Sequence, residues 1–144
     1  MDTIGTLRHR TGRYVNKRRR ADFDTLRARY ADVWNVPWGR TGNTPEGAAA
    51  YRAAVDVACA AEGRDPATLR RSASVLVERP GSVPYPPGYP AWAVPPLTGT
   101  PADLAERFRE HARAGITVLQ VWVNPPTPSG VEYVAEALAL FDRA

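Results

Sequence analysis

The feature that most constrains the fold is a recurring helix start, in which a capping side chain stands directly before a proline. Four pairs have this form: Thr44-Pro45, Asp65-Pro66, Thr100-Pro101 and Thr127-Pro128. Threonine and aspartate accept hydrogen bonds from the free N–H groups of a first helical turn, and proline suits the first position because no N–H is needed there. The pairs predict helices from Pro45, from Pro101 and from about residue 129, with a brief helical turn after Asp65.

The ends and faces of these helices are also predicted. Gly63 and Gly115 stand where the first and second long helices should stop. Near the last helix, Ser129 with Glu132 offers a second possible cap besides Thr127. The apolar residues expected to form the buried stripe of that helix are Val131, Val134, Ala135, Leu138 and Phe141.

Short apolar runs alternate with the helices. They are ADVWNV at 31–36, SASVLVE at 72–78 and ITVLQVWV at 116–123, and their length and β-branched content predict strands. The third run is apolar on both faces apart from Thr117 and Gln120, as in a parallel strand covered by helices. Repeated strand–helix units predict a parallel α/β sheet, either an open doubly wound sheet or part of a (β/α)8 barrel.

Polar residues on one face of the strands favour the barrel. Gln120 shares a strand face with Trp122, and Ser72, Ser74 and Glu78 share a face of the preceding strand. Polar side chains that increase toward the carboxyl ends suit a barrel interior that opens into a pocket. We therefore expect a partial (β/α)8 TIM barrel, with about three strand–helix units and parallel strands.

Length and charge set the domain organisation. With 144 residues the chain has the size of one domain, and its net charge of +4 comes from RHRTGRYVNKRRR at 8–20. We expect a basic N-terminal segment over 1–24, either a solvated tail or a phosphate-binding arm, and the folded part over 25–144. A single cysteine, Cys59, and the lack of a long apolar run favour a cytoplasmic protein without membrane insertion.

Residues 79–97 interrupt the alternation of strands and helices. This segment holds seven of the fourteen prolines, together with Tyr85, Tyr89 and Trp92. Such a composition excludes a helix or a central strand and predicts an extended loop. It could be a stiff surface loop, or a lid, because it leaves the carboxyl end of the second strand, where α/β proteins place their sites. A third, weaker hypothesis is a ligand for a proline-recognising domain.

The sequence contains no motif that identifies a particular enzymatic reaction. The sequence has no P-loop, no nucleophile motif and no His/Cys cluster with metal-ligand spacing, so no catalytic residue and no metal ligand is assigned. Cys59 and His111 fit packing residues better than a nucleophile and a ligand. Any chemistry is expected to come from a bound cofactor.

The candidate site lies at the strand ends. Trp34, Asn35, Trp122 and Asn124, with Glu78 between them, stand at the carboxyl ends of the three strands. A flat ligand could stack on a tryptophan while an asparagine forms hydrogen bonds, so these four residues are candidate pocket walls for a cofactor. Each tryptophan could equally be a large core side chain, and each asparagine a turn former.

Several motifs resemble one known family. They are Ala-Arg-Tyr-Ala-Asp-x-Trp-Asn at 28–35, Gly-Arg-Asp-Pro at 63–66, Gly-Thr-Pro at 99–101 and Ala-Gly-Ile at 114–116. In order and spacing, residues 25–144 resemble the C-terminal part of the bacterial luciferase-like monooxygenases. The resemblance implies an oxidoreductase that uses FMN or the deazaflavin coenzyme F-420 on a small-molecule substrate.

The resemblance also implies an incomplete barrel. The three strands would be the sixth to eighth, the earlier strands that carry most of the family's catalytic groups would be absent, and cofactor binding by this chain alone would be doubtful. We then expect self-association or pairing with a complementary half-barrel, because unpaired sheet edges attract further strands. The alternatives are a non-catalytic remnant or partner subunit of the same fold, and a nucleic-acid-binding protein that uses residues 8–20.

Overall fold

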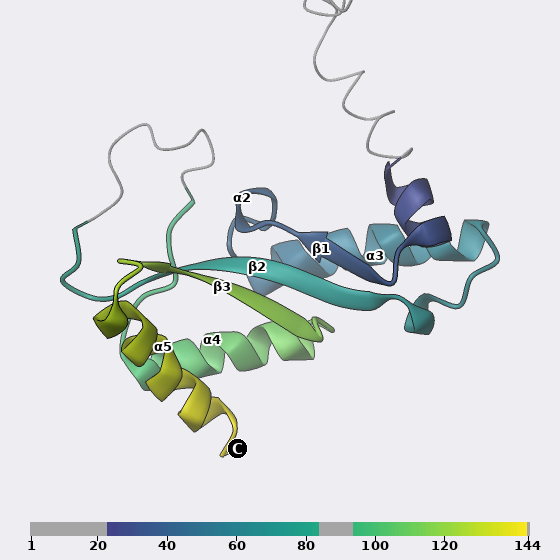
Figure 1. Cartoon of the computed structure of the whole chain (residues 1–144). Helices are drawn as coiled ribbons and strands as arrows, with labels where there is room; N and C mark the ends of the chain where they lie inside the picture. Colours follow the sequence, from purple (N-terminus) through teal and green to yellow (C-terminus); the bar gives the residue numbers. More distant parts are fainter. Residues whose placement is uncertain (1–22, 84–93, 144) are drawn as a thin grey trace, which may run out of the picture.

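The protein is an α/β structure in which parallel strands alternate with helices (Figure 1). The structure is a computed structural model that describes residues 23–83 and 94–143. The basic stretch 8–20 and the central part of the proline-rich loop, 84–93, therefore lie outside the described residues, and the predictions of a phosphate-binding arm and of a lid stay predictions.

The elements follow the predicted order. Residues 23–30 are helical and lead into β1 (Val33–Val36), the short α2 (Trp38–Thr41), α3 (Pro45–Ala61) and the 3-10 turn η2 (Pro66–Thr68). These are followed by β2 (Arg70–Glu78), α4 (Pro101–Arg113), β3 (Val118–Asn124) and α5 (Pro128–Phe141). The three strands form one sheet in the order β1-β2-β3, and both pairings are parallel. The α/β prediction is thereby confirmed.

All four predicted helix starts are confirmed. Thr44, Asp65, Thr100 and Thr127 each accept a hydrogen bond from a backbone N–H of the turn that follows. Thr100 also forms a complete capping box with Asp103. At α5 the cap is Thr127, so the alternative cap at Ser129 is wrong.

Two of these starts share a further feature, a glycine three residues after the threonine. An ideal Cβ built at Gly47 would overlap the carbonyl of Thr41, and one built at Gly130 would overlap the carbonyl of Pro125. The chain before each cap therefore folds against the first helical turn at a distance that only glycine permits. The glycine of each Thr-Pro-x-Gly sequence is explained by this close approach.

The helices pack on one face of the sheet, which we call the helix-covered face. Trp34 and Val36 of β1 pack with Ala73 of β2 and the buried side of α3, and Val75 and Val77 of β2 pack with α4 and α5. The core thus has two groups of buried side chains, one under α3 and one under α4 and α5. Because residues two apart on a strand share a face, the same face of β2 contributes to both groups. In Figure 1, α3 lies beside β1 and β2, and α4 and α5 lie beside β3.

The buried stripe of α5 differs from the prediction. Tyr133 and Ala137 are buried, whereas Val131 and Leu138 are 58% and 44% exposed. The small Ala137 permits close packing, and Tyr133 donates a hydrogen bond from its hydroxyl to the carbonyl of Gly99, 3.0 Å away. Helix rotation is thus set by these contacts rather than by the most hydrophobic stripe, and the predicted stripe is wrong at Val131, Ala135 and Leu138.

The other face of the sheet, which we call the open face, has no helix packed across it among the residues the structure describes, apart from the contact that Trp38 of α2 makes at one end. Its side chains alternate with those of the helix-covered face. They are Val33, Asn35, Arg70, Ser72, Ser74, Leu76, Glu78, Val118, Gln120, Trp122 and Asn124.

Candidate functional site

The four predicted pocket-wall residues divide between the two faces. Trp34 lies on the helix-covered face, where its side chain is 1% exposed and packs in the core, and its indole Nε1 is buried without a hydrogen-bond partner. Asn35, Trp122 and Asn124 belong to the open face. The structure therefore brings three of the four residues onto one face and places Trp34 in the alternative role of a large core side chain. Cofactor binding by the three stays a prediction.

A hydrogen-bonded row crosses the three strands of the open face. The side-chain amide of Asn35 on β1 donates to Ser74 Oγ on β2 over 3.4 Å, and Ser74 Oγ donates to Gln120 Oε1 on β3 over 3.2 Å. We call Asn35, Ser74 and Gln120 the polar row. Sequence reasoning placed Ser74 and Gln120 on one face from their spacing but did not assign them to a site.

The polar row leaves hydrogen-bonding capacity unused. Asn35 Oδ1 and Ser72 Oγ are both buried without a partner, and Asn35 and Ser72 are register partners on neighbouring strands. Each buried polar atom without a partner costs about 1–3 kcal/mol. Two such atoms side by side mark a place where a water molecule or a ligand group would be stabilised.

An aromatic pair lies next to the polar row. The Trp122 side chain is 55% exposed, and its ring lies 5.0 Å from that of Trp38, at an interplanar angle of 58°. Two residues along a strand span about 6–7 Å, so Trp122 is one step from Gln120 on the same face. The exposed indole therefore offers an apolar surface beside a polar one. Trp38, which directly follows Pro37, was not predicted to take part.

Glu78 and Asn124 end their strands as register partners. The Asn124 side-chain amide donates to Glu78 Oε2 and to the carbonyl of Val83, both over 3.1 Å. Asn124 is 7% exposed, and a cis peptide bond joins it to Pro125. Both N–H groups of its amide are thus used within the chain, so its present contacts order the loop that follows β2.

Asn43 is a buried residue with a structural role that the sequence did not predict. Its side-chain oxygen accepts a hydrogen bond from Leu76 N over 3.0 Å, and its amide donates to the carbonyls of Leu76 and Pro95 over 2.9 and 3.0 Å. β1 pairs with β2 only as far as Ala73, and the Asn43 side chain makes the hydrogen bonds to Leu76 that a longer β1 would otherwise make. Asn43 has a left-handed φ of 61°, which asparagine tolerates better than most residues. The asparagine residue type is therefore the local feature of the sequence that fits this conformation.

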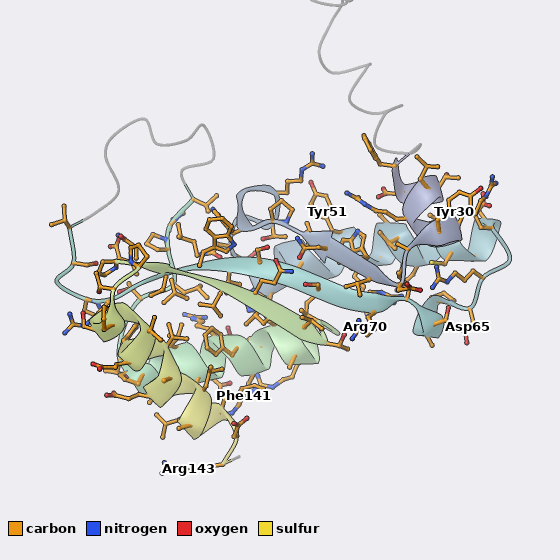
Figure 2. The ribbon with its side chains drawn as sticks, in the orientation of Figure 1. Tyr30, Tyr51, Asp65, Arg70, Phe141 and Arg143 are labelled. Carbon is orange, nitrogen blue, oxygen red and sulfur yellow. The ribbon has the colours of Figure 1, made fainter. Side chains whose placement is uncertain are left out.

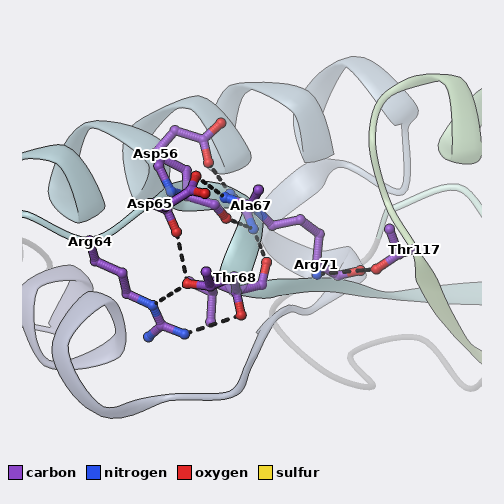
Figure 3. Close-up of polar contacts among 9 residues, drawn as sticks. Asp56, Arg64, Asp65, Ala67, Thr68, Arg71 and Thr117 are labelled. Carbon is purple, nitrogen blue, oxygen red and sulfur yellow. Dashed lines mark hydrogen bonds and ion pairs between the residues drawn. The ribbon is translucent and has the colours of Figure 1, made fainter.

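A second polar cluster surrounds the start of β2, away from the strand ends (Figure 3). Arg71 is 8% exposed, forms an ion pair with Asp56 of α3 and donates to the carbonyl of Pro66 over 2.7 Å, while the Thr117 hydroxyl donates to the carbonyl of Arg71 over 3.1 Å. Figure 2 places Asp65 and Arg70 at the same end of the sheet. This cluster joins α3, β2 and the residue before β3, and within it Arg71 Nε is buried without a hydrogen-bond partner.

The predicted packing roles of Cys59 and His111 are confirmed. Cys59 is fully buried in the core, and His111 is 1% exposed with its Nδ1 2.8 Å from the carbonyl of Arg107. Within residues 23–83 and 94–143, no three His, Cys, Asp or Glu side chains are grouped as a metal site requires.

A pocket of about 350 Å³ lies away from the open face, between the N-terminal ends of α4 and α5. Arg79, Glu132, Tyr133 and Glu136 are among its lining residues. Burial raises the pKa of Tyr133 above its ordinary value of 10.0, and the charge of Asp103 adds to this effect. Because one arginine faces two carboxylates here, the pocket has no marked preference for an anion or a cation.

Among the residues described, no helix has both the length and the apolar character needed to span a bilayer. Comparison with models of protein families, with curated proteins and with solved structures gives no match to this chain.

Proposed function

We propose that this chain is part of a flavin- or deazaflavin-dependent oxidoreductase of the bacterial luciferase-like family. In this proposal its three strands are the sixth to eighth of a (β/α)8 barrel, and the open face looks into the barrel. The parallel strand order, the helices confined to one face and the four motifs that resemble the family support it. In such barrels the site lies at the carboxyl ends of the strands.

The observation that carries the proposal is the polar row beside an exposed indole. A buried sheet interior is normally apolar, and a solvated surface normally carries charges, whereas this face has uncharged amides and hydroxyls next to Trp122. Ligand pockets combine such aromatic surface with a few convergent polar groups. The open face therefore suits one side of a planar, uncharged ring system with polar edges.

The residues present fit the ring of a flavin or deazaflavin. The orphaned Asn35 Oδ1 can accept a hydrogen bond from a ring N–H, the exposed Gln120 amide can donate to a ring carbonyl, and the Trp122 indole can stack on the ring. When bound, the cofactor supplies hydride transfer or oxygen activation. The side chains of this chain bind the ring, orient it and exclude water from one of its faces.

A titration tests the proposal. The purified chain is mixed with FMN and, separately, with oxidised and reduced F-420, and tryptophan fluorescence and cofactor absorbance are followed. We expect saturable binding of at least one cofactor, and we expect Trp122→Ala to weaken it about tenfold, the effect of losing about 1.4 kcal/mol of stacking.

The control and the contrary result are defined by the same titration. Val57→Ala removes an exposed apolar side chain of similar accessibility from α3, where it is 71% exposed, and should leave affinity unchanged. If none of the cofactors binds, or if Val57→Ala weakens binding as much as Trp122→Ala, the open face is not by itself a cofactor site.

A non-catalytic partner subunit of the same fold is the second candidate. The ionisable side chains among the described residues of the open face are Arg70, at the start of β2 and thus at the opposite end from the candidate site, and Glu78, which is already bonded to Asn124. This favours a chain that binds a ring without moving protons on it. Cofactor binding without reduction of the oxidised cofactor by alcohols or aldehydes, and without oxidation of the reduced cofactor by oxygen faster than that of the free cofactor, would support this candidate over the enzyme.

A further inference from the structure

Within residues 23–83 and 94–143, no strand pairs with the second side of the β3 backbone. β3 pairs with β2 on one side only, and its seven residues, VLQVWVN, form the edge of the sheet in the part of the chain that the structure describes. Proteins usually protect such an edge with charged residues, proline or a bulge, because its free N–H and C=O groups pair with other strands. β3 has no charged residue and no proline, and its ladder to β2 has no bulge.

Apolar side chains flank this edge on both faces of the sheet. On the open face, Val118 is 36% and Trp122 is 55% exposed. On the helix-covered face, a groove of about 310 Å³ runs between β3, α4 and α5, with Val121, Phe141 and the 44% exposed Leu138 in its lining. In Figure 1 the C-terminal end of α5 lies away from β3.

We propose that a second copy of this chain pairs with the β3 edge. A two-fold axis makes the two β3 strands antiparallel and joins the two sheets into one of six strands. With the axis at Val121, the central residue of β3, the largest number of residues is paired. Gln120 of one copy then faces Trp122 of the other, and Leu119 faces Val123.

The chemistry of the edge is compatible with pairing to a second copy of the chain. A closed two-fold contact places the same surface on both partners, so a charged strand would meet its own charge and be repelled. β3 carries no charge, and in this register each exposed apolar side chain meets an apolar or amide-bearing one. The β1 edge, with four residues, offers a shorter ladder.

The dimer does not rest on the proposed function. In a closed barrel the β3 edge would pair with another strand of the barrel and would not be free to form a dimer. The proposed dimer therefore concerns the chain of residues 1–144 by itself. The two ideas are tested apart, because the dimer is measured without cofactor.

Disulfide cross-linking tests the pairing and its register. Directly opposed residues of antiparallel strands have Cα atoms about 4.5–5.5 Å apart, within the range of a disulfide. We expect Val121→Cys to form a covalent dimer under mild oxidation, because two copies of residue 121 face each other across the axis. The native Cys59 is fully buried and should not compete. Val57→Cys, on an exposed position of α3, is the control and should stay uncross-linked.

Sedimentation measures the assembly without a new cysteine. The wild-type chain should sediment as a dimer, with twice the chain mass of 15.8 kDa. The variant Val121→Lys should keep the circular dichroism spectrum of the wild type and sediment as a monomer. Val57→Lys should remain dimeric. A monomeric wild type, a ladder of larger species, or equal cross-linking of the two cysteine variants would overturn the proposal.

Discussion

The two faces of the sheet contain the same three strands but hold their side chains by different means. On the helix-covered face, Trp34, Val75 and Val77 are at most 1% exposed and packed by helices, and the polar exception, Arg71, is held by Asp56 and backbone carbonyls. On the open face, by contrast, the large aromatic side chain Trp122 is 55% exposed. Among the described strand residues, each face also holds two polar atoms that are buried without a partner, Trp34 Nε1 and Arg71 Nε on the helix-covered face and Asn35 Oδ1 and Ser72 Oγ on the open face. The faces therefore differ in how exposed their large side chains are: one face completes the core, whereas the other presents an aromatic surface that a ligand could contact.

Exchanging tryptophan for alanine on each face tests this contrast most strongly. Trp34→Ala should lower the free energy of unfolding by about 3–5 kcal/mol, because it removes a fully buried aromatic side chain and leaves a cavity. Trp122→Ala should cost clearly less, since more than half of its side chain is exposed. Urea denaturation followed by circular dichroism measures both values. Equal losses would mean that the open face is as much a part of the core as the other.

Asn43 tests how far β2 depends on a substitute for its missing neighbour. Asn43→Ala should lower the free energy of unfolding by about 1–3 kcal/mol, because it leaves the N–H of Leu76 without a partner in a buried place. Asn43→Ala combines the loss of the side-chain hydrogen bonds with the cost of a left-handed φ for alanine. Asn43→Gly isolates the first contribution, since glycine accepts the φ of 61° but makes none of the hydrogen bonds. If Asn43→Gly is as stable as the wild type, the side-chain bonds contribute nothing.

Thr100 tests the start of a helix that covers one face. Thr100→Ala should lower the free energy of unfolding by about 1 kcal/mol through loss of the cap. In the intact cap, hydrogen bonds from the Thr100 side chain and backbone hold the pKa of Asp103 below its ordinary value of 3.8. The stability that this adds is present above about pH 4 and is lost as the pH falls through the lowered pKa.

The same variant should change the titration of Asp103. In Thr100→Ala the pKa of Asp103, followed by NMR, should rise toward its ordinary value because the hydroxyl donor is gone. Thr98→Ala, an exposed threonine outside the capping box, is the control and should not move it. An unshifted pKa in Thr100→Ala would show that the side-chain hydrogen bond is not what lowers it.

The sequence could predict the features that depend on short stretches of chain. The helix caps at Thr44, Thr100 and Thr127 and the three strands are such features, because a cap or an alternating strand is defined within a few residues. It could not assign the face of Trp34, since Trp34 and Asn35 are adjacent and either could face the helices. That choice depends on α3 packing against Trp34, a contact between segments far apart in the sequence.

Ser74 gives the smallest expected effect and the sharpest test of the open face. Ser74→Ala removes the central hydroxyl of the polar row, but Gln120 is exposed and Asn35 is half-buried, so both amides can turn toward water. The loss of unfolding free energy should therefore stay below about 1 kcal/mol, the low end for a hydrogen bond whose partners remain solvated. Ala73→Ser, which adds a hydroxyl to the helix-covered face one residue away, should cost more because that face has no partner for it. The opposite order would mean that the polar row stabilises the fold itself, and a role in ligand binding would no longer be needed to explain it.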